Sequence, residues 1–200
     1  MKKVLIAEPI YTAMTPDVYM NRIEFWKTVW GNDVPQGFYR AMPLVMGPRR
    51  NIRSARDIAI RKALELDATH LFFLDDDIKV TPQILDVLLR QDKAIIGGLI
   101  HKDDGTPVIF ADSPDGEVQW LSHPKSGSFE CAAIGAGCML ISVAVLKRLM
   151  GLCQEKPAQW LFNYDHTKRS MDVLFCRLAR SCGFTVWCWP DIPCTQIVHY

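Results

Sequence analysis

The sequence has almost no net charge, no long uncharged apolar run and no paired-cysteine motif. Its 23 lysines and arginines nearly balance its 22 aspartates and glutamates, which argues against a protein that coats a polyanion. The longest uncharged apolar stretch, Cys131 to Leu146, is shorter than the roughly 20 residues that span a bilayer, so we expect no membrane span. The 7 cysteines include no Cys-x-x-Cys pair, which favours reduced thiols in a cytoplasmic protein over a disulfide framework. A zinc cluster of Cys182, Cys188 and Cys194 stays open, although its spacing matches no recognised ligand pattern.

What remains is the composition of a globular protein. Apolar residues make up 49% of the chain and charged residues 22%, and there is no internal repeat or low-complexity tract. A chain of 200 residues predicts one domain, residues 1–200. Near the N-terminus, Glu8 and Pro9 interrupt a short apolar run, which favours a first β-strand over a signal peptide.

The first half alternates strand and helix signals. Residues 4–7 and the uninterrupted apolar runs 69–74 and 94–100 are typical of strands buried on both faces, as in a parallel sheet. Ser54, followed by an acidic residue three positions later, predicts the N-cap of one helix, and Thr81 before a proline predicts another. This alternation indicates a right-handed α/β arrangement.

The second half is more mixed. Residues 107–111 and 117–121 flank a proline-aspartate-glycine turn, which predicts an antiparallel hairpin. Helices are expected over 142–150 and 170–182, each followed by a glycine, and a late strand over 184–189. The expected fold class is therefore α/β, with a mainly parallel sheet flanked by helices and a small antiparallel hairpin.

The acidic triplet Asp75, Asp76 and Asp77 carries the most chemical information. It follows directly on a buried strand, although aspartate is depleted in strands. On an extended chain Asp75 and Asp77 share one side and Asp76 faces the other. Carboxylates at the carboxyl end of a parallel strand provide hard oxygen ligands for Mg²⁺ or Mn²⁺, at the edge where open α/β sheets bind ligands. The simpler alternative is a solvated turn.

An arginine and a set of alternating aromatic residues are further candidates for ligand contacts. Arg56 lies near the expected start of a helix, where free N–H groups already favour an anion such as a diphosphate. Trp160, Phe162 and Tyr164 alternate in sequence, so their rings would share one side of an extended segment. They could stack on an acceptor sugar or a base, or form the buried face of a strand.

The run from Asn51 to Asp77 resembles the nucleotide-binding half of GT-A glycosyltransferases, especially the large family-2 type. In that family an arginine in an early helix precedes a hydrophobic strand and a D-x-D motif. The resemblance covers about 150 of the 200 residues and continues in four further segments. These are Ile96-Gly97-Gly98, the glycine-containing strand 134–141, Met171-Asp172 opening a helix, and His199 near the end. Compact chains of this kind are similar to glycosyltransferases encoded in bacteriophage genomes, which would place the protein in the host cytoplasm.

The resemblance implies a role for each matching residue on the donor side. Asp75 and Asp77 would form the D-x-D, with Asp77 the direct ligand of Mn²⁺ or Mg²⁺ and Asp75 directed to the ribose or the metal. Asp76 would lie in the same donor-binding turn. The remaining donor-side residues would be Pro9 and Tyr11 at the nucleobase, Arg56 at the nucleotide, and Gly135 and Gly137 at the sugar.

On the acceptor side, Asp172 would be the general base of an inverting transfer, and His199 would complete the metal shell. The family's Glu-Asp pair reads Met171-Asp172 here, so one of its two carboxylates is missing. The expected partner is a nucleotide-sugar donor, with a UDP-sugar favoured. The acceptor stays open between a glycan, a protein hydroxyl and a modified DNA base, and the oligomeric state is equally open.

We consider three alternative functions besides glycosyl transfer. A non-catalytic nucleotide-sugar-binding protein would keep the fold and lack turnover, as the single carboxylate at Asp172 allows. A haloacid-dehalogenase-like phosphatase also places two aspartates after a strand, but Lys79 and the mid-chain position argue against it. A nucleotidyltransferase would need a glycine-rich phosphate loop after the first strand, which the sequence lacks.

Overall fold

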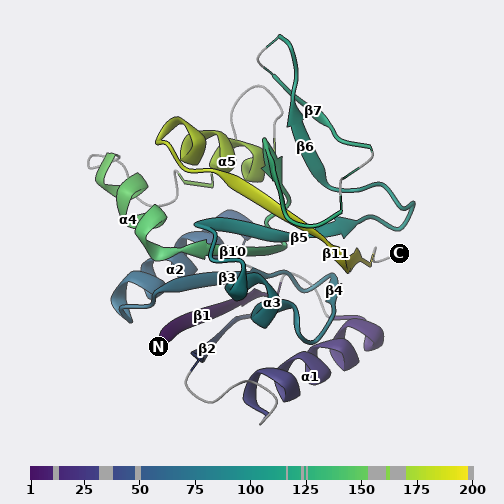
Figure 1. The fold of residues 1–200 in the computed structure, drawn as a ribbon. Coiled ribbons are helices and arrows are strands. Elements are labelled where there is room, and N and C mark those ends of the chain that lie inside the picture. The colour runs from purple at the N-terminus through teal and green to yellow at the C-terminus, as the bar shows by residue number, and fades with distance from the viewer. Residues whose placement is uncertain are drawn as a thin grey trace.

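A large mixed sheet with helices on both faces forms the centre of the molecule (Figure 1). The computed structural model describes residues 1–10, 14–31, 38–47, 51–115, 117–122, 124, 126–152, 161–162 and 170–197. Its helices are α1 (Pro16–Trp30), α2 (Ile52–Glu65), α3 (Ile84–Arg90), α4 (Val143–Leu152) and α5 (Met171–Ser181). The strands of the large sheet are β1 (Lys2–Pro9), β2 (Tyr39–Met46), β3 (His70–Leu74), β4 (Ile78–Val80), β5 (Ile95–His101), β8 (Phe129–Cys131), β10 (Cys138–Ser142) and β11 (Val186–Gln196). A smaller sheet holds β6 (Ile109–Asp112), β7 (Val118–Trp120) and β9 (Ala133–Ile134).

The large sheet is mainly parallel, as expected from its apolar runs. Its order is β2-β1-β3-β10-β5-β11-β4, with β8 paired to β11 outside this path. Strands β1, β2, β3, β5 and β11 run in one direction, whereas β10, β4 and β8 run against them. The expected hairpin is confirmed, because β6 and β7 pair antiparallel.

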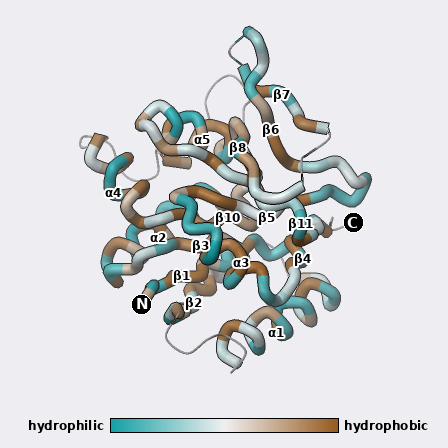
Figure 2. The backbone as a smooth tube through the Cα atoms, viewed as in Figure 1, coloured by the Kyte–Doolittle hydropathy of each residue, from teal (hydrophilic) through white to brown (hydrophobic). Residues whose placement is uncertain are grey.

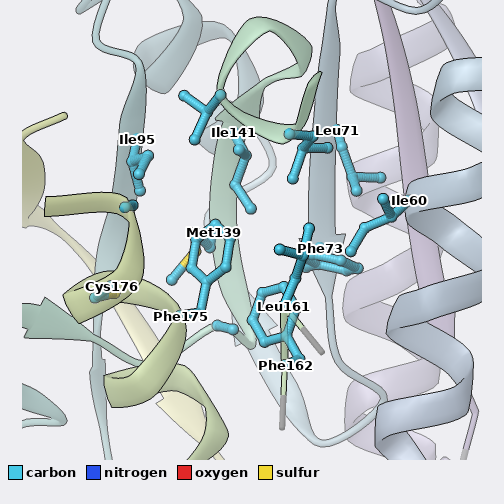
Figure 3. Packing of buried hydrophobic residues seen from close by; sticks show 14 of the residues in the cluster. Ile60, Leu71, Phe73, Ile95, Met139, Ile141, Leu161, Phe162, Phe175 and Cys176 are labelled. Carbon is cyan, nitrogen blue, oxygen red and sulfur yellow. The ribbon is translucent and has the colours of Figure 1, made fainter. Parts of the chain in front are cut away.

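Alternating side chains divide the apolar core between the two faces of the sheet. On β1, Leu5 and Ala7 pack toward α2, α4 and α5, whereas Val4 and Ile6 pack toward α1 and α3. Figure 2 shows the hydrophobic central strands between more polar helix exteriors. Figure 3 shows part of the core on the face that α2, α4 and α5 cover, where Phe73 of β3 packs against Phe162, and Phe162 packs against Phe175.

Several local expectations need correction. The helix α2 begins at Ile52, not at Ser54, because the Asn51 side chain accepts the Ser54 N–H at 2.8 Å and acts as the N-cap. Helix α3 begins at Ile84, and Thr81 contributes only its backbone carbonyl to the preceding turn. The expected glycine-containing strand 134–141 is two strands, β9 and β10, separated by a turn.

At the helix ends, one glycine has the expected role and the other does not. Gly183 follows α5 with a φ of 87°, the left-handed conformation typical of a residue after a helix end. Gly151 lies inside α4, so it is not past the end of the helix as expected. The cysteines at 131, 138, 176, 182, 188 and 194 are free thiols, as expected, and among the described residues no cysteine group could hold a metal. No described helix is both long and apolar enough to cross a membrane.

Gly97 should be intolerant of a side chain, because a Cβ there would lie 2.6 Å from the backbone oxygen of Cys138. We expect Gly97→Ala to lower the free energy of unfolding by about 1–3 kcal/mol, since the neighbouring backbone must move. The matched control is Gly151→Ala, where a Cβ in helix α4 has nothing within 4 Å. Urea unfolding should show the control unchanged or more stable by up to about 1 kcal/mol. Equal losses in both variants would contradict this packing account.

Candidate donor-binding site

The acidic triplet lies at the carboxyl end of β3 and forms a turn rather than a continued strand. The N–H of Ile78 donates to the Asp75 carbonyl at 3.2 Å, and β4 begins at Ile78. The prediction that Asp75 and Asp77 share one side of an extended strand therefore does not apply, because these residues lie in a turn. Asp75 and Asp77 nevertheless lie near enough for their charges to repel each other.

Arg56 connects the acidic turn to helix α5. Its Nη2 lies 3.0 Å from Oδ2 of Asp75 and 3.8 Å from Oδ1 of Asp172. The side chain is only 3% exposed, with the guanidinium carbon 5.0 Å from the Phe73 ring centroid and 5.1 Å from that of Phe162. Arg56 thus faces two carboxylates from a largely aromatic surrounding (Figure 3 shows both rings).

Helix α2 places Arg56 at this point because its other buried positions are small or aliphatic. Ala55, Ala59 and Ile60 pack in the same core cluster as Phe73 of β3, which keeps the first turns of the helix close to the sheet. The Asn51 cap fixes where the helix begins, so Arg56 comes in its second turn. Arg56, predicted to face a nucleotide, is therefore held at the sheet edge by its helix.

Asp172 comes from the first turn of α5, on the other side of Arg56. The Ser170 hydroxyl caps this helix by accepting the Val173 N–H at 3.3 Å. Oδ2 of Asp172 accepts the backbone N–H of Ala136 at 3.0 Å, which ties α5 to the turn between β9 and β10. The other oxygen, Oδ1, is buried and has no hydrogen-bond partner.

The glycines of the β9–β10 turn have different physical roles. A Cβ at Gly137 would lie 3.1 Å from Oδ2 of Asp75, so this glycine keeps space beside the carboxylate. Its carbonyl also accepts the Asp75 N–H at 3.0 Å. A Cβ at Gly135 would instead lie 3.1 Å from a Val108 side-chain carbon. A Cβ at Gly137 would also lie 3.1 Å from a side-chain carbon of Ile78, so both glycines allow close packing, and Gly137 in addition borders the Asp75 carboxylate.

Asp77 and Asp76 have different surroundings from Asp75. Oδ2 of Asp77 accepts from the Gln196 amide at 2.8 Å, and its backbone carbonyl accepts the Ile197 N–H at 2.8 Å. Asp76 is buried, and its charge acts to raise the pKa of Arg22 against the lowering by burial. The end of β11 is therefore fastened to the acidic turn.

Some of the remaining predicted site residues lie among the described residues and others do not. Pro9 is buried as the last residue of β1, paired in register with Met46 of β2. Tyr11 and His199 lie outside the described residues, as do Trp160 and Tyr164. Phe162 is buried and stacks on Phe175 with ring centroids 4.4 Å apart, which agrees with the core alternative for that ring.

A second buried arginine, which was not among the predicted site residues, lies beneath the acidic turn. Arg22 of α1 lies 2.8 Å from Glu8 through its Nε, and its Nη2 donates to the Asp75 carbonyl at 2.8 Å. Glu8 also accepts the indole N–H of Trp26 at 2.7 Å. The available signal was helical spacing, because Arg22 shares the buried stripe of α1 with Val18, Phe25 and Val29.

Burial dominates the electrostatics of Asp75. Loss of solvent, with a smaller contribution from the charges of Asp77, Asp172 and Asp76, raises the pKa of Asp75 to about 6 against the opposing pull of Arg56. Burial also raises the pKa of Glu8, against the pull of Arg22. The attraction of Arg56 therefore does not fully compensate the burial and the mutual repulsion of the carboxylates around Asp75.

The oxygen donors at this edge fit a divalent cation that is shared with a ligand. Oδ1 of Asp75 is buried without a hydrogen-bond partner, as is Oδ1 of Asp172. Within the described ranges, however, no three His, Cys, Asp or Glu side chains are placed so as to hold a metal. Mg²⁺ characteristically takes one or two carboxylates and completes its shell with substrate phosphates and water. Carboxylates of the acidic turn could supply such a partial shell.

The fold, which carries the candidate ligand site at its carboxyl edge, is similar to that of several solved structures. No protein-family model matches the sequence, and no curated protein matches it either. The comparison with solved structures finds A197 from STIV, at a TM-score of 0.62 and 14% identity, covering 100% of this chain and 87% of that one.

Two other solved structures share the fold with longer chains. GalNAc-T7, crystallised with UDP, GalNAc and Mn²⁺, aligns at a TM-score of 0.55 and 12% identity over 99% of this chain and 44% of its own. TarS from S. aureus aligns at 0.54 and 12% identity over 99% of this chain and 37% of its own. The chain thus spans less than half the length of these two neighbours. At such low identity the likeness shows the fold, and it confirms the expected GT-A architecture.

The buried Asp75 carboxyl predicts a pH dependence of stability. Below about pH 4 it is protonated in both states, and as the pH rises through 6 an ionised carboxylate must remain buried. Its contribution to the free energy of unfolding therefore falls over that window, by on the order of 2 kcal/mol. In chelator-treated protein, Asp75→Asn should lack this fall, as measured by urea unfolding at pH 4 to 7.

The matched control for this pH series is Asp67→Asn. Asp67 is exposed, lies at the far end of α2 and has a φ of 51°, which asparagine also tolerates. The control should follow the wild-type pH profile. If Asp75→Asn follows it as well, burial of Asp75 does not raise its pKa as described.

Proposed function

We propose that the protein is a metal-dependent glycosyltransferase that moves a sugar from a nucleotide-sugar, with a UDP-sugar favoured, to an acceptor hydroxyl. The observation that carries the proposal is the convergence of Asp75 and Asp172 on Arg56 at the carboxyl edge of a GT-A sheet. Each carboxylate keeps one buried oxygen that has no hydrogen-bond partner. The UDP and Mn²⁺ in the GalNAc-T7 structure support the same donor class.

On the donor side, the diphosphate would lie over the acidic turn. When bound, Mn²⁺ or Mg²⁺ would neutralise charge that builds on the departing nucleoside diphosphate. Asp77 and Asp75 would hold the cation, with His199 as the further ligand implied by the family resemblance. Arg56 would hold Asp75 in place from α2, and Gly137 would keep the space beside that carboxylate open.

On the acceptor side, Asp172 would act as general base. The acceptor oxygen would attack the anomeric carbon as its proton passes to Oδ1 of Asp172. The bond from the anomeric carbon to the diphosphate would break, and its electron pair would leave with the diphosphate. The N–H of Ala136 would keep Oδ2 occupied, so that Oδ1 faces the reaction. Because the acceptor would attack from the side opposite the departing diphosphate in a single displacement, the configuration at the anomeric carbon would be inverted.

Nucleotide binding tests the donor half of the proposal. In calorimetric titrations of UDP, GDP, CDP and ADP, we expect one nucleotide, UDP, to bind and to require Mn²⁺. Asp77→Ala should weaken this binding at least tenfold, because it removes the proposed metal ligand, whereas the exposed control Asp67→Ala should leave it unchanged. Metal-independent binding, or equal binding by wild type and Asp77→Ala, would contradict the assigned metal site.

Turnover tests the acceptor half and separates the alternatives. Release of UDP from UDP-glucose, UDP-galactose and their N-acetyl forms should occur in the wild type with Mn²⁺. Asp172→Asn should bind UDP normally but release it roughly 10²–10⁴-fold more slowly, the range expected for loss of a general base. Tight UDP binding without any release, with the acceptor classes named above present, would favour the non-catalytic binding protein. The GT-A fold gives the phosphatase alternative no support.

A further inference from the structure

A large cavity lies on the α1 face of the sheet, on the opposite side from Arg56 and Asp172. Its volume is about 790 Å³, within the range of small-molecule sites. It runs along α1 and over the ends of β1 and β2, where Glu8 and Val45 are paired in register. The described residues that line it include Glu8, Tyr19, Arg22, Trp26, Lys27, Trp30 and Val45.

The walls of this α1 cavity are mostly apolar. The indole rings of Trp26 and Trp30 stack with centroids 4.4 Å apart, which gives one wall a broad flat surface. Trp30 is 63% exposed, and Tyr19 and Val45 are also more than half exposed, so apolar surface continues from the cavity to its rim. These side chains offer a hydrophobic surface to the apolar part of a ligand.

Among the charged side chains of the described lining, the groups without a full set of partners are N–H donors. The two oxygens of Glu8 already pair with Arg22 and with the indole N–H of Trp26. Arg22 is only 4% exposed, and its Nη1 is buried without a hydrogen-bond partner. Lys27 adds a second positive charge at the exposed end, where it pairs with Glu24 at 2.7 Å. The unmet requirement is therefore for an acceptor or a negative charge.

We propose that the α1 cavity binds a largely hydrocarbon ligand that carries one anionic group. The hydrocarbon part lies against Trp26, Trp30 and Val45, and the anionic group pairs with Nη1 of Arg22 or with Lys27. A free sugar does not fit, because its many hydroxyls would find few partners on these walls. The assignment is independent of glycosyl transfer, although Arg22 also donates to the Asp75 carbonyl and so joins the cavity to the acidic turn.

Decanoate and 1-decanol, used below the concentration at which either self-associates, are the probes. They share an alkyl chain and differ in the anionic end group. Binding to the full-length protein is followed by tryptophan fluorescence and by calorimetry. We expect decanoate to bind at least tenfold more tightly than 1-decanol, because only decanoate satisfies the arginine and lysine.

Two exposed positions allow substitutions that leave the core intact. Trp30→Ala removes one wall, and Lys27→Glu reverses the charge at the mouth, so each should weaken decanoate binding at least tenfold. The controls are Trp120→Ala on β7 and Lys62→Glu on α2, where Lys62 forms an equivalent pair with Glu65 three residues away. Both controls should bind decanoate like the wild type.

Three results would overturn the proposal. The first is that the wild type binds neither probe. The second is that Trp30→Ala binds decanoate as tightly as Trp120→Ala does. The third is that 1-decanol binds as tightly as decanoate, which would remove the anionic part of the assignment. Thermal unfolding of each variant, compared with the wild type, confirms that a loss of binding is not a loss of fold.

Discussion

The buried guanidinium of Arg56 is the constraint on which the candidate site depends. A buried cation is tolerated only when it is paired, because its desolvation costs several kcal/mol. Here Asp75 comes from the end of β3 and Asp172 from the start of α5, so one charge requirement fixes two elements far apart in the sequence. The rings of Phe73 and Phe162 also pack against the guanidinium, with centroids 5.0 and 5.1 Å from its carbon. The site is thus assembled by the same packing that stabilises this face of the sheet.

Asp75 is held from both faces of the sheet. Arg56 reaches its side chain from α2, whereas Arg22 reaches its backbone carbonyl from α1. This double attachment positions an acidic turn that electrostatic repulsion would otherwise open. It also means that the two arginines are not equivalent, since Arg56 faces the proposed reaction and Arg22 faces the α1 cavity. An anionic ligand in that cavity would act on the turn through the guanidinium that supports it.

The parts of the fold governed by local apolar runs could be predicted from the sequence. Strands β3 and β5 and the hairpin β6–β7 fall where the pattern placed them, because buried strands and tight turns leave strong local signals. Helix α1 and strand β2 were missed. In α1 the apolar stripe contains Arg22, whose burial depends on tertiary partners, namely Glu8 and the carbonyl of Asp75. The pairing of Arg56 with Asp75 and Asp172 could not be predicted from the sequence either. The sequence supplied the residue types, but their distances depend on how α2 and α5 pack on the sheet.

The most direct test of the central claim is the position of the metal in a crystal structure with UDP and Mn²⁺, located from its anomalous scattering. We expect one Mn²⁺ peak between a carboxylate oxygen of the turn at Asp75 and Asp77 and the diphosphate, with Arg56 still paired to Asp75. That peak should be absent without UDP if the protein supplies only part of the shell. A Mn²⁺ bound away from this turn, or UDP bound at another edge of the sheet, would contradict the assignment of the donor site.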